Sequence, residues 1–159
     1  MIELNDRIGA ARYITKTNTT GTDTFKSTEQ GYLGVVSGDK VYFYNEPTRK
    51  HTADSVFDIS KLTELPQVDI LYEYENNGSY LYDAAVAAGA KGIVVAGSGN
   101  GSLSKRSKAG ALKAIASGTA IVRSTRTGSG VVTHSDEDDQ NGMISSDSLN
   151  PQKARILLM

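Results

Sequence analysis

The chain lacks cysteine altogether, and it also lacks a surplus of charge of either sign. Without cysteine there can be no disulfide, no thiolate metal site and no cysteine nucleophile, and the redox compartment stays open. The 17 Lys and Arg residues face 18 Asp and Glu residues, which leaves a formal net charge of −1. Because no segment gathers a cluster of Lys and Arg, the sequence predicts no nucleic-acid partner and no membrane-surface partner. A near-neutral charge balance is more typical of a protein that binds a small polar partner than of one that binds a nucleic acid or a membrane surface.

Long apolar runs are missing as well. No stretch approaches the roughly 20 apolar residues that a membrane span needs, and the opening MIELNDRIGAARYITK has no basic flank followed by an apolar core. The sequence therefore predicts neither a transmembrane helix nor a signal peptide. IELND begins a strand at residue 2 without a lead-in, and NPQKARILLM begins a helix that stops after about two turns. We expect both ends of the chain to be cut.

The amino-terminal segments are typical of β-strands. RYITKT, TFKS and GYLGVVSGDKVYFYN are rich in β-branched and aromatic residues, and Ser37, Gly38 and Asp39 form a turn signal between VV and KVYFY. We therefore expect a β-hairpin over residues 31–44. From Asn45 the chain becomes polar and rich in turn residues, which is typical of a linker between two folding units.

The segments that follow alternate between strand and helix. The expected strands are VDILYEY, KGIVVAG and TAIVRST, and the expected helices are SYLYDAAVAAGA and SKAGALKAIASG, the second closed by Gly118. A further helix should begin at Pro151, with Asn150 as its N-cap, and should cover one face of the sheet. Short apolar strands that alternate with helices predict βαβ units and a parallel sheet, so the expected fold class is α/β.

Two loops follow strands at the edge where a parallel sheet binds its ligands. This edge collects the carboxyl ends of the strands and the amino ends of the helices. The loops cover residues 96–105, AGSGNGSLSK, and residues 124–132, STRTGSGVV. The next segment, THSDEDDQNG, is acidic, and we expect it to be a loop.

Several phrases of the sequence, in their order, resemble the bacterial type II L-asparaginases and glutaminase-asparaginases. They are RYITKTNTTGTDTFKS, GYLGVVSGDKVYF, RKHTADSVFDISKLTELPQVDILY, GAKGIVVAGSGNGSL, TAIVRSTRTGSGVV and SSDSLNPQKARILLM. The resemblance runs from Leu4 to Met159 and covers the later part of the family's chain. It implies that residues 1–48 are the last strand and a hairpin remnant of a large N-terminal α/β domain. Residues 49–66 would be a linker, and residues 67–159 a small C-terminal domain with a flavodoxin-like or Rossmann-like parallel sheet, truncated in its last helices.

The resemblance implies a threonine-dependent amidohydrolase whose catalytic segments do not appear in this sequence. The family's nucleophile lies in a Thr-Gly-Gly-Thr-Ile segment, a second Thr and an Asp lie in a His-Gly-Thr-Asp-Thr segment, and a catalytic Lys follows. The run GTDT at residues 21–24 lies instead between TKTN and TFKS, on variable residues of the family's pattern, and follows the polar TNTT. We expect it to be a surface turn, in which Gly21 and Asp23 serve the turn geometry. We therefore assign no catalytic residue to this chain.

Asn100 and Glu137 are the candidate substrate-binding residues. The resemblance implies a site shared between subunits, to which a neighbour's small domain supplies an Asn from a Gly-Asn-Gly loop and a Glu from a late acidic loop. Asn100 matches the first motif, and its amide offers donors and an acceptor between glycines that allow a close approach. From the residues alone it would be a left-handed turn residue. Glu137 matches the second position, where a carboxylate would bind an α-ammonium group, but Asp136 or Asp138 could take the role, and a solvated acidic turn is the plainer interpretation.

Other candidates carry less weight. His51 and His134 are far apart and have no neighbouring ligands at metal spacing, so we expect no zinc site. The loop at residues 97–101 lacks the glycine spacing and the acidic residue of a dinucleotide site, and no Gly-x-Ser-x-Gly elbow surrounds Ser124 or Ser129. We expect packing and rim positions for the tyrosines of the second unit, which are Tyr72, Tyr74, Tyr80 and Tyr82.

Two hypotheses of different classes follow. In the first, as the resemblance implies, the chain is part of an L-asparaginase or glutaminase that uses a Thr nucleophile and no cofactor, acts on L-asparagine or L-glutamine, and forms a homotetramer or pairs with a complementing N-terminal part. The isolated chain would then be inactive, because it lacks the nucleophile. In the second, the chain is a non-catalytic α/β module that binds an amino acid or mediates oligomerisation. A receiver-like domain is excluded, because the acidic pair and Lys that it needs are not at the strand ends.

The resemblance also implies a periplasmic location, with the cytoplasm as the alternative. The sequence does not separate a preference for asparagine from one for glutamine.

Overall fold

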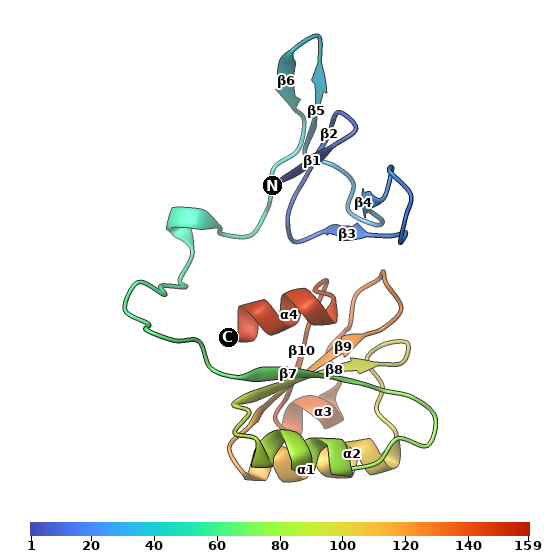
Figure 1. Cartoon of the computed structure of the whole chain (residues 1–159), viewed down its shortest axis with the longest axis vertical. Helices are drawn as coiled ribbons and strands as arrows, with labels where there is room; N and C mark the ends of the chain where they lie inside the picture. Colours follow the sequence, from blue (N-terminus) through green and yellow to red (C-terminus); the bar gives the residue numbers. More distant parts are fainter. The chain divides into compact units, whose positions relative to one another are not determined.

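The computed structural model describes residues 1–159, which divide into two compact units, Met1–Thr63 and Glu64–Met159. Figure 1 labels the strands and helices of both units. None of the helices combines the length and the apolar character needed to cross a membrane.

The first unit consists of short antiparallel strands. One sheet has the strand order β1-β2-β5-β6, and β3 pairs separately with β4. The strands are β1 (Ile2–Leu4), β2 (Arg7–Gly9), β3 (Ile14–Lys16), β4 (Phe25–Ser27), β5 (Gly34–Ser37) and β6 (Lys40–Phe43). The buried hydrophobic residues of this unit are Ile8, Ala10, Ile14 and Leu33, so its core is small.

The hairpin predicted over residues 31–44 is formed by β5 and β6. Ser37 pairs with Lys40 across a two-residue turn. The turn residues Gly38 and Asp39 both have positive φ, 55° and 59°, which is the combination found in type I′ turns. This turn type matches the right-handed twist of the flanking strands, so the turn residues fix the register of the hairpin.

The segment between the last strand of the first unit and the first strand of the second is mostly irregular. It contains one short 3-10 helix, η1 (Thr52–Asp54), and the large hydrophobic residues Val56, Phe57 and Ile59 are exposed. The division between the compact units, after Thr63, lies within this segment.

The second unit is a parallel four-stranded sheet with helices on both faces, which confirms the predicted α/β fold class. The strand order is β10-β9-β8-β7, and every neighbouring pair is parallel. The strands are β7 (Val68–Tyr72), β8 (Gly92–Gly97), β9 (Ala120–Thr125) and β10 (Met143–Ser145), and the helices are α1 (Tyr80–Ala87), α2 (Lys105–Ala116), α3 (Asp136–Gln140) and α4 (Pro151–Leu158). Figure 1 shows α1, α2 and α3 on one face of this sheet and α4 on the other.

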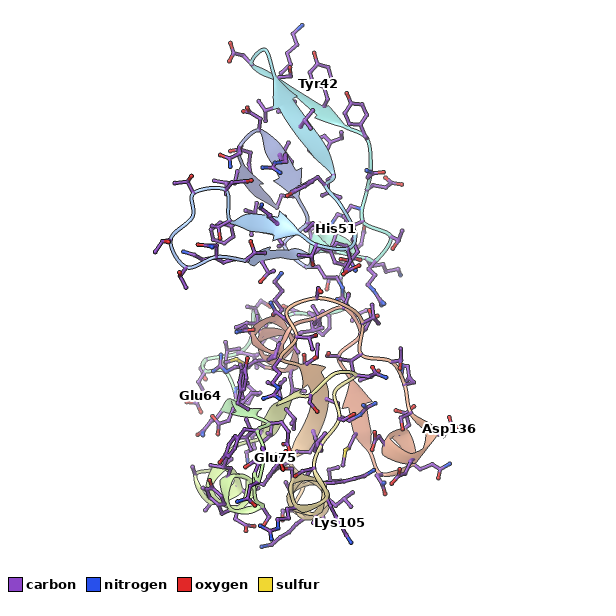
Figure 2. The ribbon with its side chains drawn as sticks, turned by 90° about the vertical axis from the view of Figure 1, so that its right-hand side faces the viewer. Tyr42, His51, Glu64, Glu75, Lys105 and Asp136 are labelled. Carbon is purple, nitrogen blue, oxygen red and sulfur yellow. The ribbon has the colours of Figure 1, made fainter.

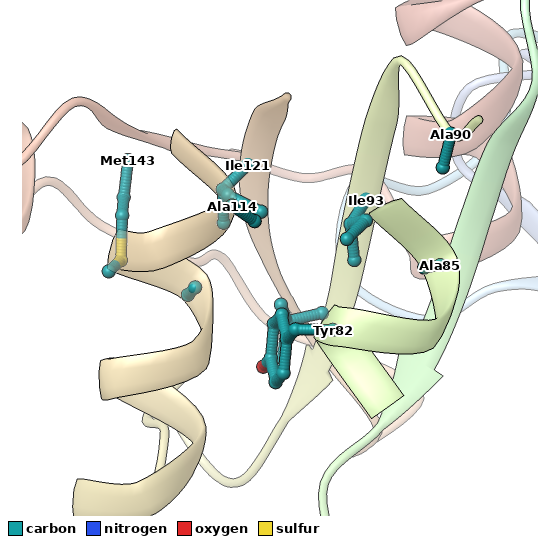
Figure 3. Packing of buried hydrophobic residues seen from close by; sticks show 9 residues of the cluster. Tyr82, Ala85, Ala90, Ile93, Ala114, Ile121 and Met143 are labelled. Carbon is teal, nitrogen blue, oxygen red and sulfur yellow. The ribbon is translucent and has the colours of Figure 1, made fainter. Parts of the chain in front are cut away.

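The central strand β8 is buried on both faces. Ile93 and Val95 belong to a hydrophobic cluster with residues of α1 and α2, whereas Val94 belongs to a second cluster with residues of α4. In the first cluster, Tyr82 of α1 and Ala114 of α2 pack on the sheet around Ile93 (Figure 3). A strand covered on both sides needs an unbroken apolar run, and this is what KGIVVAG supplies.

The helix ends follow the predicted capping residues. The side chain of Asn150 accepts a hydrogen bond from Lys153 N (3.0 Å), and Pro151 occupies the first helical position of α4. Gly118, with φ 88°, follows the end of α2. This left-handed conformation suits a glycine after a helix.

The acidic segment that we expected to be a loop contains a helix and leads into a strand. Ser135 caps α3 by accepting a hydrogen bond from Asp138 N (3.5 Å), and four acidic residues occupy the first turn, where the helix dipole favours negative charge. The strand β10 has only three residues, and its register is set by pairing with β9, where Met143 lies beside Ile121. Neither α3 nor β10 shows a hydrophobic periodicity in its sequence from which it could be predicted.

Candidate functional site

The candidate site begins with the tight loop that follows β8. Ser98 and Ser102 exchange two backbone hydrogen bonds (3.1 and 2.9 Å), and Asn100 lies at the tip of the turn between them. The glycines on either side, Gly99 and Gly101, both have positive φ, 50° and 71°. The turn therefore depends on residues that adopt the left-handed conformation without strain.

This turn lies close against the end of β9. A Cβ atom added to Gly101 would be 2.9 Å from Cγ1 of Val132 and 3.1 Å from the carbonyl oxygen of Ser124. The loop after β9 is also tied to β8, because Arg126 N donates to the Gly97 carbonyl (3.0 Å). The two loops that we expected at one edge of the sheet do meet there.

The side-chain amide of Asn100 is held by Thr133, the residue that directly follows the second loop. Its Nδ2 donates to Thr133 Oγ1 (2.7 Å), and its Oδ1 accepts from Thr133 N (2.8 Å). The residue itself is exposed. Because a primary amide has two N–H groups, one N–H of Asn100 stays available to a ligand.

Arg123 of β9 lies beneath these loops. Its side chain is 3% exposed. Nη1 donates to the carbonyl oxygen of Asn100 (3.2 Å), and Nη2 donates to the carbonyl oxygen of Thr133 (3.0 Å). Its Nε lies 3.2 Å from Oδ2 of Asp138, an ion-pair contact. The buried guanidinium group thus donates two hydrogen bonds to carbonyls, and the Asp138 carboxylate balances its charge without accepting a hydrogen bond from Nε.

Glu137 and Asp138 share a single lysine. Lys108 Nζ of α2 lies 2.7 Å from Glu137 Oε1 and 2.8 Å from Asp138 Oδ1. The hydrogen bonds to Asp138 and then to Glu137 raise the pKa of Lys108. Burial alone would raise the pKa of Asp138, but the hydrogen bond from Lys108 and the charge of Arg123 outweigh it and lower this pKa.

The three acidic candidates of α3 differ in exposure. The side chain of Glu137 is 75% exposed, whereas that of Asp138 is 16% exposed and contacts two cations. Asp136, labelled in Figure 2, is the exposed first residue of α3. Glu137 therefore offers more free carboxylate surface than Asp138.

The residues that sequence reasoning missed are Arg123, Thr133 and Lys108. Arg123 gave a signal, because it is the one charged residue in the apolar strand AIVRST, and a charge in such a strand needs buried partners. Thr133 and Lys108 gave none, because their roles depend on contacts with distant segments.

Residues 21–23 form an exposed bend, so the surface expected there is confirmed for them, but Thr24 is buried, at 4% exposed, and Asp23 has another role than turn geometry. Asn18 Oδ1 accepts hydrogen bonds from Thr20 N (3.0 Å) and Gly21 N (2.8 Å), which holds the turn. Asp23 instead accepts hydrogen bonds from the side chains of Asn5 and Arg7. The hydrogen bond from Asn5 is the first cause of its lowered pKa, followed by Lys26 and the charge of Arg7.

The remaining candidates do not form a second site. No group of three or more His, Cys, Asp or Glu residues is arranged to hold a metal ion, and His134 contacts Asp139 (3.0 Å). Tyr82 is fully buried, whereas Tyr72, Tyr74 and Tyr80 are exposed, and the hydroxyl groups of Tyr74 and Tyr80 share a 2.7 Å hydrogen bond.

The parallel sheet and its polar loop cluster define an α/β protein with a candidate ligand site at the carboxyl ends of its strands. Residues 67–159 match the family model described as Glutaminase/Asparaginase C-terminal domain, and residues 1–49 match the model described as Asparaginase, N-terminal. The chain therefore belongs to the glutaminase/asparaginase family, which confirms the resemblance seen in the sequence.

Individual relatives agree with this assignment. The chain is 62% identical over its whole length to L-asparaginase 2 of Bacillus subtilis, and 39% identical over 99% of its length to a probable periplasmic L-asparaginase of Haemophilus influenzae. It spans 42% and 46% of those proteins, respectively. The crystal structure of a probable cytoplasmic L-asparaginase from Campylobacter jejuni matches 98% of this chain and 51% of its own, with a TM-score of 0.94 and 46% identity.

Proposed function

We propose that this chain is part of an L-asparaginase-type amidohydrolase that converts L-asparagine and water to L-aspartate and ammonia, or L-glutamine to L-glutamate. Family membership supports the reaction class. The observation that carries the role of this chain is the Asn100 amide, which is held at the tip of a glycine turn with one N–H left for a ligand. Its place at the carboxyl edge of the sheet is the usual place for a ligand in such folds.

The chemistry would use residues outside the 159 described here. A Thr hydroxyl attacks the carbon of the substrate's side-chain amide, and the proton it loses leaves with the departing ammonia. Water then hydrolyses the acyl-enzyme ester, which releases the amino acid product and restores the hydroxyl. The sequence has no Thr-Gly-Gly-Thr-Ile segment to supply this nucleophile.

The part played by this chain is to hold the amino-acid end of the substrate. The free N–H of Asn100 would donate to the substrate, and the exposed Glu137 carboxylate would accept a charge-assisted hydrogen bond from the α-ammonium group. Lys108 and Arg123 balance the charges of Glu137 and Asp138. A bound ammonium group would therefore compete with Lys108 for Glu137.

This role fits a homotetramer in which the small domain of one subunit completes the site of its neighbour. In that arrangement, residues 1–48 belong to the large domain, residues 49–66 to the linker and residues 67–159 to the small domain. A separate N-terminal part that complements this chain would also complete the site, by supplying the catalytic segments. We propose the periplasm as its location, with the cytoplasm as the alternative, since relatives named for each compartment exist.

The test uses this chain joined to the family's catalytic segments, as one polypeptide or by complementation. We expect Asn100→Ala and Glu137→Gln each to raise KM for L-asparagine about tenfold, and Asp136→Asn to leave it unchanged. The isolated chain should release no ammonia, because loss of a nucleophile and its activating groups costs on the order of 10⁶ in rate. Ammonia release above a boiled control that scales with the amount of isolated chain would contradict this.

The second candidate is a non-catalytic module that binds an amino acid or mediates oligomerisation. The edge strand β6, whose four residues are all exposed, favours it, because an open strand edge promotes association. Titration calorimetry of the isolated chain with L-asparagine, L-aspartate and L-glutamine tests binding. Reading the DNA upstream of Met1 distinguishes the two candidates, because an in-frame Thr-Gly-Gly-Thr-Ile segment would support the enzyme.

A further inference from the structure

Arg123 occupies a position that normally holds an apolar residue. It lies in β9 between β8 and β10, where it pairs with Val95 and Ser145, and its side chain is 3% exposed. Burying a guanidinium group without partners would be strongly unfavourable. The partners of the Arg123 side chain should therefore show which structural role the residue has.

Two of these contacts are to main-chain carbonyls of different loops. Nη1 donates to Asn100 and Nη2 donates to Thr133, which are 23 and 10 residues away in the sequence. Because the guanidinium group is planar and rigid, it fixes the two carbonyls relative to each other. Thr133 in turn holds both ends of the Asn100 amide. The direction of the amide is thus set through Arg123.

The third contact extends the arrangement to α3. Arg123 Nε lies beside Asp138 Oδ2, while Asp138 Oδ1 and Glu137 Oε1 both contact Lys108. Asp138 balances the buried charge of Arg123 and is the neighbour of Glu137 in the first turn of α3. Arg123 is therefore connected to both candidate substrate contacts, to Asn100 directly and to Glu137 through Asp138.

We infer that Arg123 is a positioning residue, which fixes the Asn100 turn, the Thr133 loop and the start of α3 in the arrangement that binds the substrate's amino-acid end. This inference rests on the proposed function. Lysine cannot replace arginine here, because a single ammonium group does not present the rigid fork of Nη donors that reaches both carbonyls at once.

The first test is kinetic and uses the chain joined to the family's catalytic segments. Arg123→Lys should raise KM for L-asparagine about tenfold with a much smaller change in kcat, because substrate positioning is lost and the nucleophile is untouched. The matched control is Arg126→Lys, at the same edge of the sheet. The Arg126 side chain donates from Nη1 to the Glu73 carbonyl (2.8 Å) and not to Asn100 or Thr133, so KM should stay unchanged.

A double variant separates positioning from general damage. If Arg123 acts through Asn100, then Asn100→Ala combined with Arg123→Lys should raise KM little further than Asn100→Ala alone. If Asn100→Ala raises KM and Arg123→Lys does not, the inference is overturned while the proposed function stands. If Asn100→Ala has no effect on KM, the proposed site is wrong and the inference falls with it.

A second measurement needs no activity. Amide hydrogen exchange of the 159-residue chain should become about tenfold faster in Arg123→Lys at Ser102 and Thr133, while the amides that pair β7 with β8 keep their protection. Should Arg123→Lys fail to fold, Asp138→Asn takes its place, because it removes the counter-ion at nearly constant size. Unchanged exchange at both amides in the folded variant would overturn the inference.

Discussion

Thr133 holds the side-chain amide of Asn100 from both ends, although the two residues are 33 positions apart in the sequence. The Thr133 hydroxyl accepts from Nδ2 (2.7 Å), and the Thr133 backbone N–H donates to Oδ1 (2.8 Å). Asn100 is therefore not a freely rotating turn residue. The two hydrogen bonds to Thr133 fix the orientation of its side-chain amide.

The Thr133 hydroxyl can be removed without changing the volume of the side chain. Thr133→Val should raise KM for L-asparagine about fivefold in the chain joined to its catalytic segments, because one hydrogen bond worth about 1 kcal/mol is lost. Thr133→Ser keeps the hydroxyl, so its KM for L-asparagine should stay close to that of the parent. Equal KM values for the two variants would show that the hydroxyl does not orient Asn100.

The two glycines beside Asn100 should differ in their tolerance of a side chain. Gly101→Ala combines a left-handed φ of 71° with a Cβ only 2.9 Å from Val132, so we expect the free energy of unfolding to fall by about 3 kcal/mol. At Gly99 no atom lies within 4 Å of the added Cβ. Gly99→Ala should therefore lower the free energy of unfolding by only about 1 kcal/mol. Urea unfolding followed by the helical circular dichroism signal measures the second unit, which contains all four α-helices.

Glu73 is a buried carboxylate with a structural role. It is 4% exposed, its Oε1 accepts from Ser104 N at the start of α2 (2.9 Å), and its Oε2 accepts from Asn77 Nδ2 (3.2 Å). Glu73→Ala should lower the free energy of unfolding by about 2–3 kcal/mol, because a buried donor of Asn77 and the half-buried N–H of Ser104 lose their acceptor. The exposed Glu75 is the matched control, and Glu75→Ala should change stability by less than about 0.5 kcal/mol. Similar losses in both variants would refute this role.

Asp138 should contribute to the acid stability of the second unit. Its pKa is lowered in the folded chain, so its stabilising contribution is present above the unfolded pKa of about 4 and is lost as pH falls through the lower folded value. The stability difference between the parent and Asp138→Asn should therefore be largest at neutral pH and shrink on acidification below about pH 4. Urea midpoints measured across this range test it, and a difference that does not vary with pH would contradict the ion pairs with Lys108 and Arg123.

The elements that the sequence predicted correctly have local causes. The apolar run of β8, the Gly38-Asp39 turn and the Asn150-Pro151 helix start each follow from a few adjacent residues. The elements that it missed, α3 and β10, have no such pattern. A polar five-residue helix and a three-residue strand are stabilised by a cap, by ion pairs and by pairing with β9.

The sequence by itself determined the α/β class, the family and Asn100 as a candidate substrate-binding residue, because these depend on motifs of a few consecutive residues. Only the tertiary structure decided how Asn100 is held. The parallel sheet brings the loops after β8 and β9 to one edge, where Arg123 and Thr133 contact Asn100 across 23 and 33 residues of sequence. Such contacts depend on the packing of the whole unit, and no local pattern of residues encodes them.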